Sequence, residues 1–192
     1  MKRFVVFIII GLLAAGCRSF DVIVKDDPFK GSTIVTADMW HKVTDAKIDN
    51  RRALYKKEIV RGKVSNPTVS FEFGAQIIPI IGYQGAPLGN DVYILCDAKN
   101  FMVKLIDNNK VMQTQIGSGQ SINVQMTNIC TLTGRITLTP DIQKAIQNRQ
   151  NYQIRFNIGN DNLTLKATPA QLDAVKKFIA TNTPDAGKKE IK

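Results

Sequence analysis

The sequence is poor in the side chains on which most metal sites and many enzyme sites depend. It contains one histidine and three cysteines among 192 residues. A single imidazole excludes any site that needs two, and zinc sites usually take three or four ligands from histidine, cysteine and carboxylates. Hydrophobic residues make up 44% and charged residues 22%, which excludes wholesale disorder, a collagen-like chain and a multi-span membrane protein. One folded domain with a net charge of +10 remains.

Recognisable catalytic and ion-binding loops are missing as well. Gly117, Ser118 and Gly119 lie together, but a nucleophile elbow needs the pattern G-x-S-x-G and a phosphate loop needs longer glycine spacing with a lysine. The acidic residues form no D-x-D-x-D calcium loop. We therefore expect no metal ion, no cofactor and no catalytic residue set, and we interpret the chain as a non-enzymatic protein.

The N-terminus has the pattern of an export signal. Lys2 and Arg3 form a short positive segment, and residues 4–15 are an almost unbroken apolar run. Twelve residues span about 18 Å as a helix, well short of the ~30 Å hydrocarbon core of a bilayer. The run therefore favours a cleaved signal peptide over a transmembrane helix. It ends in small residues, and Gly16 and Cys17 follow.

Residues 12–17, with the sequence LLAAGC, resemble the lipobox of bacterial lipoprotein precursors. The resemblance implies that the Cys17 thiol receives a diacylglyceryl group, that a peptidase cleaves between Gly16 and Cys17, and that the new amino group is often acylated, for example with palmitate. Ala14 departs from the commonest pattern, which has leucine at this position. The alternative is an ordinary signal peptide that is cleaved nearby, with Cys17 incidental.

Lipidation would attach the mature chain to a membrane. Each buried methylene contributes about 0.8 kcal/mol, so two or three acyl chains hold a protein firmly to a bilayer. In the lipoprotein class, an aspartate directly after the cysteine retains the protein in the inner membrane. This chain has Arg18 there, so the resemblance implies the outer membrane, at either its periplasmic face or the cell surface.

Alternation of apolar and polar residues with period two begins at Thr33 and indicates half-buried strands. It is clearest over residues 122–138, where we expect a bend or break near Asn128 or Gly134. Residues 49–57 fit either a strand or a short helix. The other expected strands are residues 33–43, 54–64, 68–81, 92–97, 101–107, 111–117, 152–158 and 163–167, with hairpin turns at 107–110 and 159–162.

Two short helices are expected to interrupt this pattern. One begins at Thr139 and Pro140; the other begins at Thr168, where Gln171 completes a capping box. The sequence therefore predicts an all-β fold, a β-sandwich or open barrel of about 8–10 antiparallel strands with two short helices. The expected organisation is a signal peptide (1–16), a lipidated cysteine with a tether (17–32), a β-sandwich domain (33–182) and a flexible tail (183–192).

Cys96 and Cys130 both lie in apolar, strand-like runs. An exported chain enters an oxidising compartment, where an even pair of cysteines indicates a disulfide. Closing this loop of roughly 35 residues would stabilise the fold by about 4 kcal/mol in the chain-entropy model. Two buried free thiols or a catalytic thiol are the alternatives.

Positive charge is concentrated in residues 42–63, which contain eight basic and three acidic side chains. This excess predicts attraction to an anionic envelope or host polymer, such as lipid headgroups or acidic glycans; the alternative is a solvated face. Nucleic acid is not expected as a partner, because no stacking aromatics interleave the charges. The basic residues are Lys42, Lys47, Arg51, Arg52, Lys56, Lys57, Arg61 and Lys63.

An enzyme is the last alternative. His41, Cys130 and Arg135 occur in the chain order that sortase-type transpeptidases use for histidine, cysteine and arginine. A Cys–His pair can activate a thiolate, and a guanidinium can stabilise an oxyanion. The order of three residues is a weak resemblance, so we expect a structural or binding module of the bacterial envelope, of unknown ligand and protein partner.

Overall fold

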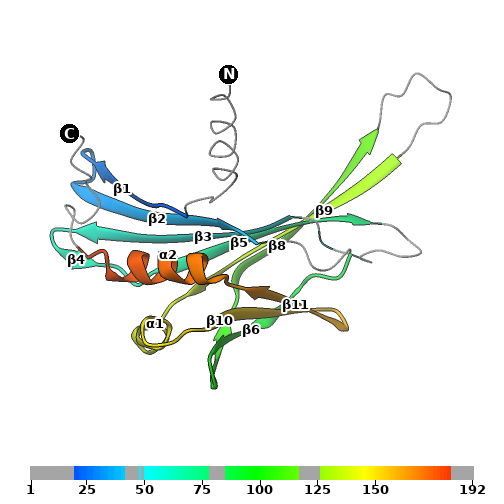
Figure 1. Cartoon of the computed structure of the whole chain (residues 1–192). Helices are drawn as coiled ribbons and strands as arrows, with labels where there is room; N and C mark the ends of the chain where they lie inside the picture. Colours follow the sequence, from blue (N-terminus) through cyan, green and yellow to red (C-terminus); the bar gives the residue numbers. More distant parts are fainter. Residues whose placement is uncertain (1–19, 42–47, 49, 78–84, 117–125, 183–192) are drawn as a thin grey trace, which may run out of the picture.

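The computed structural model describes residues 20–41, 48, 50–77, 85–116 and 126–182. These residues form two antiparallel sheets and two helices (Figure 1). The large sheet has the strand order β1-β2-β3-β5-β9-β8, with β4 paired to β3, and the small sheet has the order β11-β10-β6-β7. The strands of both sheets pair antiparallel throughout.

The elements alternate between the two sheets along the chain. The large sheet consists of β1 (Val22–Asp27), β2 (Ser32–Trp40), β3 (Asn50–Val60), β4 (Lys63–Val64), β5 (Thr68–Ile77), β8 (Ile106–Ile116) and β9 (Met126–Thr137). The small sheet consists of β6 (Leu88–Cys96), β7 (Lys99–Lys104), β10 (Tyr152–Ile158) and β11 (Asp161–Lys166), and the helices are α1 (Pro140–Gln147) and α2 (Pro169–Ala180).

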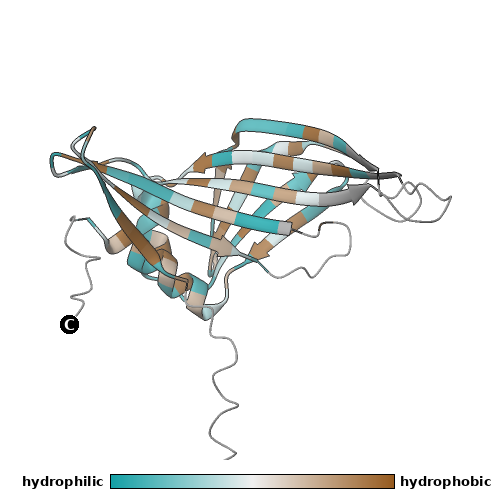
Figure 2. Cartoon of the chain, turned by 90° about the horizontal axis from the view of Figure 1, so that it is seen from above, coloured by the Kyte–Doolittle hydropathy of each residue, from teal (hydrophilic) through white to brown (hydrophobic). Residues whose placement is uncertain are grey.

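The small sheet and both helices lie on the same side of the large sheet (Figure 1). Successive residues of a strand point to opposite faces, so hydrophobic and hydrophilic bands alternate along the strands (Figure 2). The covered face of the large sheet carries the core. Its fully buried side chains include Val35, Ala37, Met39, Ala53, Tyr55, Val69, Phe71, Phe73, Leu132 and Ile136.

Aromatic side chains join the two sheets. The ring of Phe156 in the small sheet lies 4.7 Å from that of Phe71 and 5.1 Å from that of Phe73, in edge-to-face geometry. Further along, the hydroxyl of Tyr55 donates to that of Tyr152 over 3.2 Å, and the ring of Tyr55 meets the edge of Phe178 in α2. The core therefore runs as one layer from the small sheet to α2.

The structure confirms the all-β sandwich with two short helices. The capping box of α2 is present, because Thr168 Oγ1 accepts from the Gln171 amide and Gln171 Oε1 accepts from the Thr168 amide. Thr139 precedes α1 in extended conformation, but its side chain makes no capping hydrogen bond. Residues 159–162 form the predicted hairpin turn between β10 and β11.

The predicted tether is shorter in the structure. Residues 22–27, which the sequence assigns to the tether, form β1 and pair with β2 from Val22 opposite Ala37 to Asp27 opposite Ser32. The sheet therefore begins at Val22 instead of Thr33. Alternation within six residues was too short a pattern to separate this edge strand from a polar linker.

The predicted hairpin at residues 107–110 is wrong. The chain leaves the small sheet at Lys104 and enters the large sheet at Ile106, so β7 and β8 belong to different sheets. The left-handed backbone of Asp107 (φ 54°) makes a bulge between Ile106 and Asn109. Turn-forming residues thus serve as a bulge in a continuous strand. Residues 50–57 belong to β3, which settles the open choice in favour of a strand.

No break interrupts the long strand at Asn128 or Gly134, since β9 pairs with β5 without a register shift from Asn128 to Thr137. Gly134 has a packing role instead. A Cβ atom on Gly134 would lie 2.7 Å from a methyl carbon of Leu105, the residue at which the chain crosses between the sheets. The missing side chain lets the crossover pack against β9.

Candidate functional site

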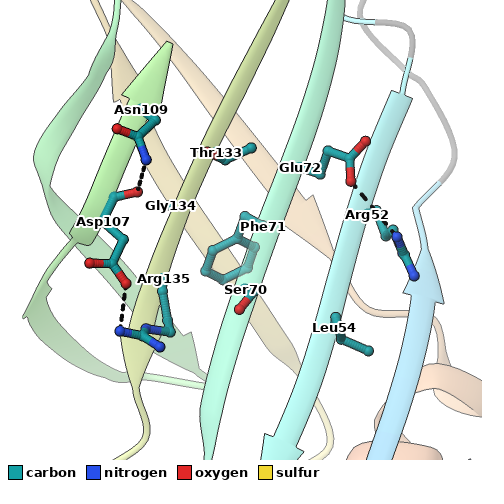
Figure 3. A pocket seen from close by; sticks show the side chains of 10 residues that line it. All are labelled: Arg52, Leu54, Ser70, Phe71, Glu72, Asp107, Asn109, Thr133, Gly134 and Arg135. Carbon is teal, nitrogen blue, oxygen red and sulfur yellow. Dashed lines mark hydrogen bonds and ion pairs between the residues drawn. The ribbon is translucent and has the colours of Figure 1, made fainter. Parts of the chain in front are cut away.

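The face of the large sheet that points away from the small sheet carries an open polar groove, here called the outer groove (Figure 3). The strand register places its side chains in two rows across four strands. One row contains Leu54, Ser70 and Arg135, and the other contains Arg52, Glu72, Thr133 and Asn109. The outer groove has a volume of about 290 Å³ and is completed by Phe71, Asp107 and Gly134.

Arg52 forms one end of the outer groove. Its Nε and Nη2 donate to the two carboxylate oxygens of Asp38 over 2.9 and 2.7 Å, and its Nη1 lies 3.7 Å from Glu72 Oε2. The guanidinium also lies 5.7 Å from the ring centroid of Trp40. The hydrogen bond that Arg52 donates to Asp38 raises the pKa of Arg52. Bidentate pairing and stacking hold this cation in one orientation.

Arg135 forms the other end of the outer groove. Its Nη2 pairs with Asp107 Oδ2 over 2.5 Å, and the bulge in β8 is what turns Asp107 toward β9 (Figure 3). The Nε of Arg135 is buried and has no hydrogen-bond partner within the described part of the chain. The outer groove therefore presents cationic hydrogen-bond donors and anionic acceptors, a lining that suits a polar ligand better than an apolar one.

A second polar groove lies on the outer face of the small sheet. It has a volume of about 350 Å³. Four carboxamides face it together with one arginine and one tyrosine, and Arg155 Nε donates to Thr164 Oγ1 over 3.3 Å. Its lining residues are Tyr93, Leu95, Asn100, Gln153, Arg155, Asn157, Asn162 and Thr164.

The basic residues of segment 42–63 do not form one surface. Successive residues of β3 point to opposite faces of the sheet, so the charges are divided between the core and the solvent. Two lie outside the described residues (Lys42 and Lys47), two are 2% exposed (Arg51 and Lys57), one is ion-paired in the outer groove (Arg52), and three are exposed (Lys56, Arg61 and Lys63).

Lys57 is a structural residue at the end of α2. Its Nζ donates to the carbonyl oxygen of Ile179 over 3.0 Å and to Asn182 Oδ1 over 3.1 Å, and it lies 5.1 Å from the ring centroid of Phe178. Ile179 belongs to the last turn of α2, whose carbonyl groups lack partners within the helix. Burial lowers the pKa of Lys57 to about 8.

The structure does not bring together the three residues of the enzyme alternative. His41 lies opposite Arg51, and Cys130 lies three strand spacings away on β9, about 14 Å at 4.8 Å per strand. Cys130 is buried, whereas Arg135 lines the outer groove. His41 instead places its Nδ1 3.3 Å from the carbonyl oxygen of Lys166, and burial lowers the pKa of its imidazole.

No disulfide joins Cys96 to Cys130 in the described part of the chain, so the predicted bridge is not found. The two cysteines lie in different sheets. Cys96 is paired with Tyr152, whose hydroxyl meets that of Tyr55. Tyr55 is paired with Val69 of β5, whereas Cys130 is paired with Ala75 of the same strand. The six residue steps from Val69 to Ala75 correspond to about 20 Å. A disulfide needs Cα atoms about 4.4–6.8 Å apart.

We expect Cys96 and Cys130 to resist thiol reagents in the folded protein. Both are 0% exposed, and burial raises the pKa of the Cys96 thiol to about 11, which keeps the reactive thiolate scarce at neutral pH. Titration of the unreduced protein, followed by peptide mass spectrometry, should find both cysteines unlabelled when folded and labelled in denaturant. If both stay unlabelled in denaturant, a bridge exists and the structure is wrong at this point.

Three acidic residues that pair with the arginines of the outer groove, Asp38, Glu72 and Asp107, were not identified from the sequence. Each is an outward-facing residue whose partner comes from another strand. Opposite charges on alternating strand positions are the only sequence signal they give. That signal becomes specific only when the strand register is known.

Among the described residues, no three His, Cys, Asp or Glu side chains gather to hold a metal ion. Neither described helix has the length and apolar character needed to cross a bilayer. No family model matches the sequence, and no curated protein or solved structure is significantly similar to it.

Proposed function

We propose that the chain is a lipid-anchored lipoprotein of the bacterial envelope and that its β-sandwich acts as a non-enzymatic structural or binding module. The observation that carries the proposal is the sequence LLAAGC at residues 12–17, at the end of a short apolar run. Cys17 lies outside the described residues, so its lipidation is inferred from this resemblance.

The position of the first strand supports the proposal. Five residue steps separate Cys17 from Val22, the first residue of β1. Five steps reach at most about 17 Å, even when fully extended. A lipid on Cys17 would therefore hold the sandwich close to the bilayer, and the outer groove would be presented to partners at the membrane. Arg18 after the cysteine favours the outer membrane in this proposal.

Metabolic labelling tests the anchor. Cells that express the full precursor are grown with an alkyne analogue of palmitate, and the N-terminal peptide of the purified protein is identified by mass spectrometry. We expect label on a peptide that begins at Cys17, and we expect the protein in the outer-membrane fraction.

Two variants serve as controls for this experiment. Cys17→Ala should lose the label, whereas Cys96→Ala should retain it, because Cys96 is buried in the folded protein. A mature protein that begins upstream of Cys17, or that carries no acyl group there, would contradict the proposal.

A further inference from the structure

Two turns lie side by side at one end of the large sheet, at the left of Figure 1. They are residues 28–31, between β1 and β2, and residues 60–64, around the β3–β4 hairpin; together they are called the tip. Ser32, which directly follows the first turn, is paired with Val60. The register therefore makes one surface from residues about thirty positions apart in the chain.

The tip exposes apolar side chains. Phe29 is 99% exposed at the apex of its turn, and Val60 and Val64 are each 39% exposed on the neighbouring hairpin. A single exposed apolar residue is ordinary on a protein surface. Here an entirely exposed aromatic ring lies on a turn next to a hairpin from which Val60 and Val64 project on opposite faces. Exposed apolar groups at a protruding end are typical of proteins that insert such groups into a membrane or a partner.

Hydrogen bonds hold Phe29 in this exposed position. Asp27 Oδ1 accepts from the backbone amides of Phe29 and Lys30, each over 3.2 Å. Gly31 follows with a φ of +60°, which closes the turn. The aromatic ring is thus displayed by a fixed turn.

The second turn is fixed as well. Arg61 and Gly62 both have positive φ, 49° and 78°, as a two-residue hairpin of type I′ requires. The carboxylate of Glu58 accepts from Ser32 Oγ over 2.6 Å. That hydrogen bond links β3 to β2 and joins the two turns into one rigid surface.

The charge of the tip is positive. Its nine residues include Lys30, Arg61 and Lys63 and no acidic residue. No ion pair involves these three cations in the part of the chain that the structure describes. The nearby carboxylate of Asp27 accepts hydrogen bonds from its own turn, and that of Glu58 accepts one from Ser32. Three cations around an apolar apex are complementary to a layer of lipid phosphates over acyl chains.

The anchor and the tip can reach the same surface. Seven residue steps along β1 and its turn separate Val22 from Phe29, about 23 Å at 3.3 Å per residue. The five steps from Cys17 to Val22 reach about 17 Å. A tether that runs back along β1 would therefore bring the lipidated residue nearly level with the tip. This step rests on the proposed lipid anchor.

We propose that the tip is a second membrane contact, which lays the anchored sandwich on an anionic phospholipid bilayer. Phe29 enters the boundary between headgroups and acyl chains, and the three cations lie among the phosphates. Each basic residue near an anionic surface strengthens binding about fivefold.

Depth-dependent fluorescence quenching tests the contact. The lipidated full chain with Val64→Cys, which keeps Phe29 in place, is labelled with an environment-sensitive dye and reconstituted in vesicles. One set is phosphatidylcholine, and the other contains about 30% phosphatidylglycerol. Both sets carry spin-labelled lipids as quenchers. The matched control carries the dye at Met102, which is 61% exposed on the small sheet.

We expect the spin-labelled lipids to quench the dye at residue 64 at least threefold more than at residue 102 in the anionic vesicles. Phe29→Ser should remove most of this difference, and so should about 0.5 M salt, which screens the three cations. Combined charge reversal, Lys30→Glu with Arg61→Glu and Lys63→Glu, should act in the same direction as salt.

The outcomes separate this inference from the anchor. Flotation with both kinds of vesicle would support the anchor. Equal quenching at residues 64 and 102 in the same samples would overturn the membrane contact of the tip. Dye shielding without quenching by lipid would show a protein partner at the tip and would also overturn it. Failure to float with phosphatidylcholine vesicles would contradict the anchor, while quenching at residue 64 in anionic vesicles still decides the tip.

Discussion

Replacing Phe156 by alanine is expected to lower the free energy of unfolding by about 3–5 kcal/mol. The side chain is 0% exposed and joins the two sheets, since its ring meets both Phe71 and Phe73 edge to face. Truncation would remove its transfer free energy, leave a cavity between the sheets and delete two aromatic contacts, each contributing about 0.5–1.5 kcal/mol. Native domains are typically stable by about 5–15 kcal/mol, so this loss is a large fraction of the stability.

Denaturant unfolding followed by circular dichroism measures this effect. Phe29→Ala is the matched control, because the same truncation is made at a ring that is 99% exposed. It should change the unfolding free energy by less than about 0.5 kcal/mol. Similar losses for the two variants would contradict the packing of the small sheet on β5.

The second large effect is expected at two adjacent lysines. Lys57→Glu should destabilise the fold by more than about 3 kcal/mol, because it places a carboxylate against the carbonyl end of α2 in a buried site. Lys56→Glu should change stability by less than about 0.5 kcal/mol, since Lys56 is exposed on the opposite face of β3. Thermal unfolding of both variants measures the difference, and equal behaviour would show that the register of β3 is wrong.

The pH dependence of Lys57 provides an independent measurement. Burial lowers its pKa from 10.5 to about 8 in the folded chain. Between these two values the unfolded chain binds more protons than the folded chain, so the contribution of Lys57 to stability rises with pH across this window. The unfolding free energy of the wild type should therefore increase relative to that of Lys57→Met from pH 8 to pH 10.5. A difference that stays constant would show that Lys57 titrates normally.

The fold class was readable from the sequence because alternation with period two is a local property. The same alternation argues against one basic surface over residues 42–63. Lys56 and Lys57 are adjacent in a strand and therefore point to opposite faces of the sheet. What the sequence could not provide was the partner of the buried lysine. The carbonyl oxygen of Ile179 lies 122 residues away, and no local pattern connects them.

The remaining differences have the same physical origin, which is strand register. Cysteine count and compartment predicted a bridge, but the register places Cys96 and Cys130 in distant rows. The ion pairs of the outer groove and the adjacency of the two turns of the tip also depend on which residues face each other across strands. Asp107 to Lys110 resembled a turn because left-handed backbone is needed equally in turns and in bulges.

The contacts of α2 have a consequence for the order in which the molecule forms. Gln171 Nε2 donates to the carbonyl oxygen of Trp40, 131 residues away, and α2 covers β1 and β2. Synthesis proceeds from the N-terminus, so the apolar face of β1 and β2 stays uncovered until α2, near the C-terminus, has been synthesised. Folding of such a nonlocal topology takes milliseconds to seconds, and over that interval a holding chaperone would protect those early strands from aggregation.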